Sequence, residues 1–239
     1  MKQDEMFGVN INAIDVPKFI SEILEDIKSE KQRCIVAINP EKLMIAREDV
    51  KLKSLLNSFD YKVPDGMGVV LASKIKKGCI KNRFTGIDCM DIICNQSRTI
   101  NAKIFLYGAK PNVVNNAKIK LEAKYPGINI VGVLDGYQED NDSIIDIINK
   151  SKADILFVAL GSPKQEYWIE NNKNKLNVKI LQGVGGSFDV ISGKVKRAPK
   201  WMQRIGLEWF YRLIKQPNRV WRQLAIVKFL YLVIVVKRH

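Results

Sequence analysis

The chain has 239 residues, of which 46% are hydrophobic and 27% charged, and it carries a net charge of +14 at pH 7. This composition excludes a disordered or fibrous chain and is sufficient to bury a full core, so it predicts one large domain or one domain with an appendage. The cysteines form no CxxC pattern and the only histidine is His239, so no metal site is recognisable and acid–base chemistry would fall to carboxylates.

Short apolar runs alternate with helical patterns through the first 195 residues. Strands are predicted at Cys34–Ile38, Lys103–Tyr107, Ile128–Val133, Asp154–Leu160 and Val178–Gln182. Helices are predicted at Val16–Ser29, Glu41–Asn57, Val113–Lys124, Asp142–Lys150 and Pro163–Asn174. Runs rich in Val, Ile and Leu are typical of strands buried on both faces, and the alternation predicts parallel βαβ units. We therefore predict an α/β domain over residues 1–195, a Rossmann-like, mainly parallel sheet with flanking helices.

Residues 194–239 carry most of the positive charge, with 12 basic side chains against one acidic side chain, Glu208. The rest of the chain is nearly neutral, so this tail is the part expected to meet an anionic partner. A solvated face, a nucleic-acid patch and a lipid-facing stripe are all open interpretations of its arginines. The aromatic side chains between them favour a membrane interface, where aromatic rings settle and basic residues meet anionic headgroups.

Two helices are predicted in this tail, at Trp201–Ile214 and Asn218–Val236. The stretch Leu224–Val236 is apolar apart from Lys228, and it is shorter than the about 20 residues that a membrane-spanning helix needs. It predicts an amphipathic helix that lies in the plane of a membrane surface. Residues 196–239 are therefore predicted to form a helical, basic C-terminal appendage that associates with membranes and helps to complete the active site.

A carboxylate follows the run that ends at Pro64, in the segment Val63-Pro64-Asp65-Gly66. Ligands of parallel sheets bind beyond the carboxyl ends of the strands, so loops of this kind are the candidates for chemistry. Asp65 has two interpretations. It could belong to a Pro-Asp-Gly turn and cap the next helix, or it could be a general base that removes a proton from an acceptor hydroxyl.

The segment Leu160-Gly161-Ser162-Pro163-Lys164-Gln165-Glu166 follows the strongest predicted strand. Ser162 as N-cap, Pro163 at the first helical position and Gln165 two residues later predict a capping box. A helix N-terminus at a strand end also presents free N–H groups to a phosphate. Gln165 could therefore serve either the cap or a ligand.

Glycines follow two other predicted strands, in Gly183-Val184-Gly185-Gly186-Ser187-Phe188-Asp189 and in Tyr107-Gly108-Ala109. They could be plain turns, or they could let the backbone approach a diphosphate closely, with Asp189 bound to a ribose or a base. The spacing is not the GxGxxG of a dinucleotide fold. Arg83 stands beside a helix-start pattern and is either a surface residue or a bidentate phosphate ligand.

Together these residues resemble the WecG/TagA/CpsF family of glycosyltransferases (glycosyltransferase family 26), and within it the TagA-type N-acetylmannosaminyltransferases above all. The motifs of the resemblance occur in order between about residues 39 and 222. They are Asn39-Pro40-Glu41, Asp65-Gly66, Arg83 with Gly86 and Asp88, Gly161 to Glu166, Gly183 to Asp189, Arg197-Ala198-Pro199, and Glu208-Trp209 with Arg212, Pro217, Arg219 and Arg222. Ala37 departs from the family, which often has Thr at this position.

The resemblance implies an inverting, metal-independent glycosyltransferase that needs no cofactor and uses a UDP-sugar donor. The acceptor would be a polyprenyl diphosphate that carries N-acetylglucosamine. The TagA branch transfers N-acetylmannosamine in teichoic acid synthesis, the WecG branch transfers its uronic acid, and other members serve capsule or exopolysaccharide assembly. The family's base position falls on Asp65.

We expect UDP to lie across the carboxyl edge of the sheet. Tyr137 and Asp189 would lie near the uridine, and the backbone at Gly108, Gly185 and Gly186 would approach the ligand. Contacts to the donor sugar or the diphosphate are expected from Asn39, Arg83 and Gln165. Guanidinium groups would stabilise the charge that develops on the departing UDP, and the tail offers Arg212, Arg219 and Arg222.

The polar N-terminus lacks a signal-peptide pattern, so we expect a cytoplasmic protein, peripheral on the inner face of the cell membrane and able to form homo-oligomers away from it. Two other classes of protein remain as alternatives. A nucleic-acid-binding module would explain the basic tail but not the glycine loops. A nucleotide-dependent oxidoreductase would share the sheet but should carry a glycine fingerprint after its first strand, where this chain has Asn39-Pro40-Glu41.

Overall fold

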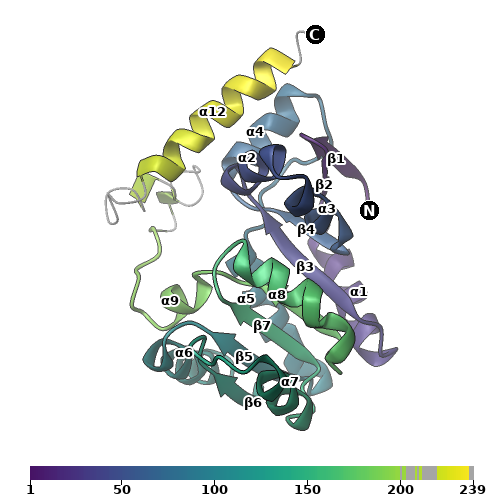
Figure 1. Ribbon diagram of the computed structural model, residues 1–239, viewed down its shortest axis with the longest axis vertical. Coiled ribbons are helices and arrows are strands. Elements are labelled where there is room, and N and C mark those ends of the chain that lie inside the picture. Colours follow the sequence, from purple (N-terminus) through teal and green to yellow (C-terminus); the bar gives the residue numbers. More distant parts are fainter. Residues whose placement is uncertain (200, 203–207, 209, 212–219, 237–239) are drawn as a thin grey trace.

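Six parallel strands form one sheet at the centre of the molecule, in the order β4-β3-β8-β7-β5-β6 (Figure 1). Their bounds are β3 Arg33–Ile38, β4 Tyr61–Pro64, β5 Lys103–Gly108, β6 Asn129–Leu134, β7 Ile155–Ala159 and β8 Ile180–Gly183. The computed structural model describes residues 1–199, 201–202, 208, 210–211 and 220–236. All five predicted strands are present within two residues of their predicted bounds, and the Rossmann-like α/β class is confirmed.

Helices cover both faces of this sheet (Figure 1). One face is packed by α2 Pro40–Glu48, α3 Val50–Ser58, α7 Asn141–Lys150 and α8 Lys164–Asn172. The other face is packed by α1 Val16–Lys28, α5 Gly86–Ser97, α6 Pro111–Lys124 and α9 Ser187–Ile191. Along β7, Leu156 and Val158 belong to the first core, whereas Ile155 and Phe157 belong to the second. This alternation explains why the strand sequence is apolar throughout.

The prediction of a single helix over Glu41–Asn57 is wrong, because the segment forms two helices, α2 and α3, that are separated at Asp49. Asp49 is extended, with φ −113° and ψ 101°, and its side chain accepts a hydrogen bond from the N–H of Leu52 at 3.0 Å. An aspartate in this position caps the second helix, and this local preference outweighs the continuity of the helical pattern.

The sequence predicted no bounds for several of the elements. Strand β4 is only four residues long and contains Lys62 and Pro64, which hide it in a search for apolar runs. A hairpin of β1 Gln3–Met6 and β2 Val9–Asn12 packs beside β4, and the side chain of Asn12 accepts a hydrogen bond from the N–H of Lys62 at 2.7 Å. Helices α4 Met67–Ile75, α5 and α9 follow strands β4 and β8 and complete the layers.

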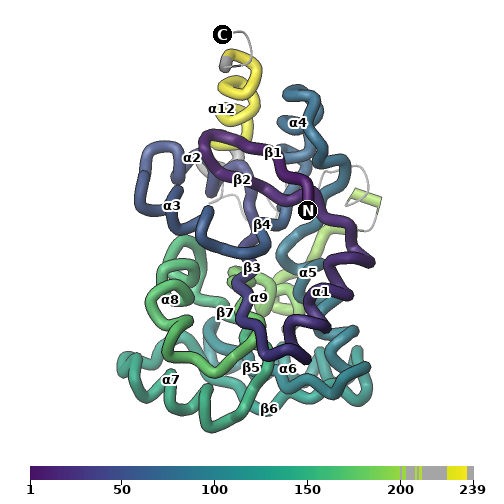
Figure 2. Tube along the Cα trace, turned by 90° about the vertical axis from the view of Figure 1, so that its right-hand side faces the viewer, coloured from purple at the N-terminus to yellow at the C-terminus, as the bar shows by residue number. Residues whose placement is uncertain are grey.

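The C-terminal helix α12 Val220–Val236 lies against α2 and α4 at one end of the molecule, as the views in Figures 1 and 2 both show. Phe229 is fully buried and meets Phe7 edge to face, with ring centroids 5.7 Å apart. The opposite side of the helix is also apolar, since Val227 is 67% and Tyr231 65% exposed. A helix is confirmed in this segment, but the prediction that it is amphipathic is wrong, because apolar side chains occupy both of these sides.

No helix in the described part of the chain is both long enough and apolar enough to cross a membrane. The helix predicted at Trp201–Ile214 falls mainly on residues outside the described ranges.

Candidate active site

The carboxyl ends of the six parallel strands bring most of the predicted site residues to one edge of the sheet. Asp65 follows β4 and Asn39 follows β3, while Gly185 and Gln165 belong to the loops and helix after β8 and β7. Tyr137 lies at the far end of this row, after β6. Strands β4 and β6 are five strand spacings apart, which amounts to roughly 24 Å. The edge therefore suits an extended ligand that lies across it.

Asp65 is positioned by its own backbone, whose N–H donates to the carbonyl of Ile38 on the neighbouring strand at 2.8 Å. Its carboxylate lies beside the start of α5, with Oδ2 4.0 Å from the point where a Cβ on Gly86 would stand. The residue does not cap α4, because Gly66 takes the N-cap position with φ +94°. Gly66 therefore supplies the positive φ of the first interpretation, but the part in which Asp65 caps the helix is wrong, and the carboxylate stands half-buried at the strand end.

Asn39 caps helix α2. Its side-chain oxygen accepts a hydrogen bond from the N–H of Lys42 at 2.8 Å, and Pro40 follows at the first helical position. The cap fixes the side chain at the end of β3 and uses its acceptor oxygen. The amide nitrogen of Asn39 can donate to a ligand without disturbing this cap.

The predicted capping box at α8 is wrong. The helix begins at Lys164, and Pro163, whose side chain has no acceptor, takes the N-cap position. Gln165 turns inward instead and is buried. Its Oε1 accepts a hydrogen bond from the N–H of Gly185 at 2.9 Å, and its Nε2 donates to Glu166 at 3.0 Å. Gln165 therefore links the start of α8 to the glycine loop after β8.

Glycine is needed at different positions of this edge for different physical reasons. A Cβ on Gly108 would lie 2.5 Å from the carbonyl oxygen of Ala159, so this glycine is required for packing against β7. Gly185 has φ +52°, and a Cβ on it or on Gly186 would meet nothing closer than 3.9 Å. The loop after β8 therefore has open space in front of its backbone, as a close approach to a ligand requires.

The two residues predicted to lie near a uridine, Asp189 and Tyr137, differ in their contacts. Asp189 lies in the first turn of α9 and pairs with Lys194 at 2.8 Å. Tyr137 is 64% exposed, and its N–H donates to the side chain of Asp135 at 2.9 Å. Both lie after strands of the site edge, but the structure brings neither into contact with Asp65.

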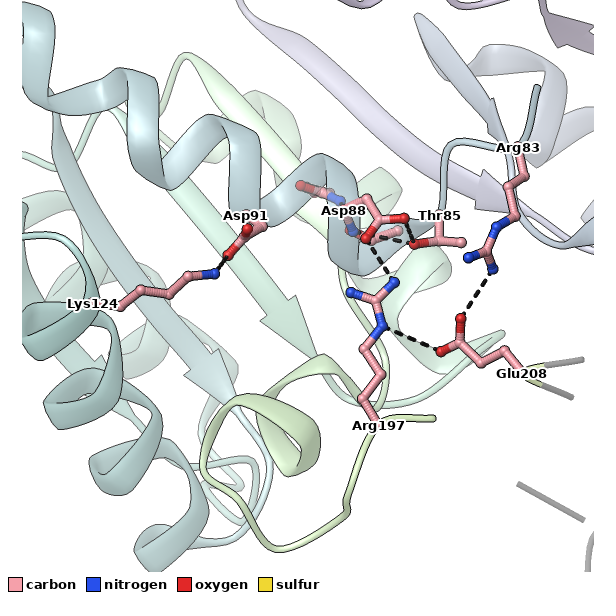
Figure 3. A network of polar contacts seen from close by, with 9 residues as sticks. Arg83, Thr85, Asp88, Asp91, Lys124, Arg197 and Glu208 are labelled. Atoms are coloured by element: carbon pink, nitrogen blue, oxygen red, sulfur yellow. Dashed lines mark hydrogen bonds and ion pairs between the residues drawn. The ribbon is translucent and has the colours of Figure 1, made fainter. Parts of the chain in front are cut away.

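Arg83 belongs to a four-membered ionic cluster that joins the tail to the body (Figure 3). One carboxylate oxygen of Glu208 forms an ion pair with Arg83 at 3.0 Å, and the other forms one with Arg197 at 3.4 Å. Arg197 also pairs with Asp88, in the first turn of α5, at 2.7 Å. Burial lowers the pKa of Arg197, but the charges and hydrogen bonds of Asp88 and Glu208 outweigh this and raise it. In this structure Arg83 therefore faces a carboxylate from the C-terminal segment.

Several residues of this site could not be recognised from local sequence. Lys42 and Glu166 form a buried pair at 2.7 Å although they are 124 positions apart, and Gln182 on β8 donates to the carbonyl of Gly86 at 2.9 Å. Arg197 and Glu208 belong to motifs of the family resemblance, but nothing in their spacing indicated that they pair. Among the predicted tail arginines, Arg212 and Arg219 lie outside the described residues, and Arg222 lies in α12 with a side chain that the structure does not describe.

The described residues contain no group of three His, Cys, Asp or Glu side chains that could hold a metal ion. The polar groups of the site edge are instead a carboxylate, amides, guanidinium groups and backbone N–H groups. A parallel α/β sheet with such an edge defines a Rossmann-like enzyme that is suited to a phosphorylated ligand.

Comparison with known proteins identifies the kind of enzyme. The family model that matches the chain, over residues 5–239, is that of the glycosyl transferase WecG/TagA/CpsF family, and the chain belongs to this family. Two curated relatives both carry the name N-acetylglucosaminyldiphosphoundecaprenol N-acetyl-beta-D-mannosaminyltransferase. The protein of Bacillus subtilis (strain 168) is 40% identical over 195 residues, 82% of this chain and 76% of the relative. The protein of Bacillus spizizenii (strain ATCC 23059 / NRRL B-14472 / W23) is 37% identical over 203 residues, 85% of this chain and 79% of the relative.

Proposed function

We propose that this glycosyltransferase moves N-acetylmannosamine from UDP to polyprenyl-diphosphate-linked N-acetylglucosamine, in the synthesis of teichoic acid or a related cell-wall polymer. The observation that carries the proposal is the 40% identity, over 82% of the chain, to a relative named for this transfer. The positions of the polar groups along the sheet edge support it, because they offer a carboxylate at one end and the open loop at Gly185 and Gly186 in the middle.

The donor would lie across the edge with its nucleotide toward β6 and its sugar toward β3 and β4. The open loop at Gly185 and Gly186 would face the diphosphate, with Asp189 and Tyr137 on the nucleotide side. Asn39 and Arg83 would contact the sugar or the phosphates, whereas Gln165, which is buried, would act through the N–H of Gly185 that it holds. This orientation brings the anomeric carbon toward Asp65 and leaves the outer side of β4 for the acceptor.

Asp65 would act as the general base. Its carboxylate removes the proton of the acceptor hydroxyl while that oxygen attacks the anomeric carbon from the side opposite to UDP, which inverts the configuration. The bond between the anomeric carbon and the phosphate oxygen breaks, and the electron pair leaves with UDP. Preorganised cations lower the energy of that developing charge, and Arg83 together with Arg212, Arg219 and Arg222 would supply them.

The C-terminal appendage would hold the enzyme on the anionic inner face of the cell membrane, where its acceptor resides. Val227 and Tyr231 would enter the interface, supported by exposed Ile234 on the same helix. Basic side chains near such a surface each contribute about 1 kcal/mol. Apolar contact and charge together support attachment that is stable and reversible.

A UDP-release assay tests the proposed reaction. The donors are UDP-N-acetylmannosamine, its uronic acid, UDP-N-acetylglucosamine and UDP-N-acetylgalactosamine, each with and without a short-chain lipid-diphosphate-N-acetylglucosamine acceptor. We expect acceptor-dependent release from UDP-N-acetylmannosamine. Preference for the uronic acid would assign the alternative donor of capsule or exopolysaccharide assembly, and no acceptor-dependent release from any donor would overturn the proposal.

A further inference from the structure

A charged pair is buried directly beneath the candidate active site. Nζ of Lys42, on α2, lies 2.7 Å from Oε1 of Glu166 on α8, and it also donates to the carbonyl of Ala37 at the end of β3 at 2.8 Å. Lys42 is 5% exposed and Glu166 is fully buried. Neither side chain can therefore reach a ligand that lies in the open loops above it.

The pair fixes which way the amide of Gln165 points. An ionised carboxylate only accepts hydrogen bonds, so Gln165 must present its NH₂ group to Oε1 of Glu166. Its oxygen then faces the N–H of Gly185, which only donates. Lys42 donates to the same oxygen of Glu166, so a continuous chain of hydrogen bonds runs from α2 through Glu166 and Gln165 to the glycine loop.

The glycine loop is the part of the site that this chain of contacts holds. Gly185 has φ +52°, a conformation that few other residues adopt, and its N–H is tied to Gln165. Gly183 lies so close to Gln165 that a Cβ on it would stand 2.6 Å from Nε2. The loop is therefore fixed from below and open above, where the proposed diphosphate lies.

We propose that Lys42 and Glu166 are positioning residues for the nucleotide-diphosphate pocket. They act through Gln165, by holding the Gly183–Gly186 loop in the conformation that receives the donor. This inference rests on the proposed function, because it names the residues that prepare the same pocket.

Stability alone is a weak explanation for the pair. Desolvation of two charges offsets much of their attraction, and well-packed apolar replacements are often as stable. The second oxygen of Glu166, Oε2, has no hydrogen-bond partner within the described ranges, which adds to the cost of burying this carboxylate. A role in shaping the loop accounts for a charge at a position where an apolar side chain would otherwise serve.

The test compares UDP affinity, measured by calorimetry, with thermal stability in the full-length protein. Glu166→Gln keeps the shape of the side chain but no longer dictates the orientation of Gln165. We expect UDP to bind about tenfold more weakly, with KM for the UDP-sugar raised by a similar factor. The double variant Lys42→Met/Glu166→Gln leaves no isolated buried charge, so it keeps the test valid should the single variant fold poorly.

Asp26→Asn is the matched control. Asp26 is also a buried carboxylate paired with a cation, Arg33 at 3.0 Å, but it lies at the opposite end of β3, where the strand begins. We expect this variant to lose stability without losing UDP affinity. The inference is overturned if a folded Glu166 variant binds UDP as the wild type does, or if Asp26→Asn loses affinity to the same extent. Failure of the wild-type protein to bind UDP would instead count against the proposed function.

Discussion

A single carboxylate, Asp65, is the residue on which the proposed chemistry depends. In the sequence it had two interpretations, a residue of a turn that caps the next helix or a general base. The structure gives the cap position of α4 to Gly66 and leaves the carboxylate beside the start of α5. The N-terminal end of a helix favours a negative charge nearby, and Oδ2 of Asp65 lies 4.0 Å from the Cβ position of Gly86, the first residue of α5.

Replacing Asp65 by Asn tests its role directly. The side chain keeps its size but can no longer take a proton, so we expect turnover to fall by about 10²- to 10⁴-fold, the usual contribution of a general base. UDP affinity should stay within about twofold, because the proposed base contacts the acceptor hydroxyl. Turnover is measured by UDP release and affinity by calorimetry. A folded variant with wild-type turnover would eliminate Asp65 as the base.

Asp4 provides a residue-scale test of pH dependence outside the active site. Burial raises its pKa, but hydrogen bonds from Ser73, Cys79 and Ile80 outweigh this and lower it below the ordinary value of 3.8. A lowered pKa means that the contribution to stability is complete above 3.8 and is lost as the pH falls through the lower, folded-state value.

We therefore expect Asp4→Asn to be less stable than the wild type at pH 7, by about 2 kcal/mol for its charge-assisted hydrogen bonds. As the pH falls below 3.8 and through the lower folded-state pKa, the difference should shrink, because the wild-type carboxylate itself becomes protonated. Chemical denaturation at pH 7 and at a series of acidic pH values measures how the difference changes. A difference that grows on acidification would contradict the assignment.

At the scale of elements, the strands could be predicted wherever an apolar run is long enough. β7 is buried along all five residues and reads as ILFVA, whereas β4 contains Lys62, whose ammonium group is satisfied by the carbonyl of Phe59. No local pattern reveals that such a lysine is buried. The same reason limits the prediction of the candidate site. The strand-end loops follow from the parallel topology, whereas the Lys42–Glu166 contact forms only in the assembled sheet.

The ionic cluster around Glu208 connects the C-terminal tail to the body of the protein. Glu208 holds Arg83 and Arg197 together and is itself buried. Glu208→Gln should cost about 2 kcal/mol of stability, because a buried charged partner of two arginines is lost. We also expect turnover to fall about tenfold, since Arg83 would no longer be held in place.

Glu170→Gln is the control for this variant, because Glu170 forms a partly exposed pair with Lys173 at 2.9 Å. Surface pairs contribute little, so its stability and turnover should match the wild type. Thermal denaturation and UDP release report the two effects. Wild-type behaviour of Glu208→Gln in both assays would show that the bridge has no part in positioning Arg83.

At the scale of the whole molecule, a nearly neutral body carries a basic tail whose last helix has two apolar sides. One side is buried on α2 and α4, and the other remains exposed. The prediction of a basic, helical appendage required only composition and periodicity. The docking of α12 could not be predicted, because it depends on Phe7 in the N-terminal hairpin, more than two hundred residues earlier in the chain.

The exposed side of α12 gives a prediction for membrane binding. Val227→Ser/Tyr231→Ser removes two apolar side chains that contribute nothing to the core, and each would be worth about 1.5–3 kcal/mol if it were fully buried in a bilayer. We expect at least tenfold weaker partition to vesicles that contain anionic lipid, with thermal stability unchanged. Ile119→Ser on α6, which alters another exposed apolar residue, is the control. Equal partition of the double variant and the wild type would exclude this side of the helix as the contact.

The close approach of α12 to Gly68 has a further consequence. A Cβ on Gly68 would stand 3.7 Å from Ile226, and Gly68 is three positions after Asp65. A helix resting on a bilayer would thus leave about one helix diameter, roughly 10 Å, between this part of the site and the lipid boundary. The polyprenyl chain would never have to leave the hydrocarbon, and only its diphosphate and sugar would rise to meet the enzyme. Turnover would then follow the two-dimensional density of acceptor in the membrane, and diluting that acceptor with inert lipid would slow the enzyme even at constant bulk concentration.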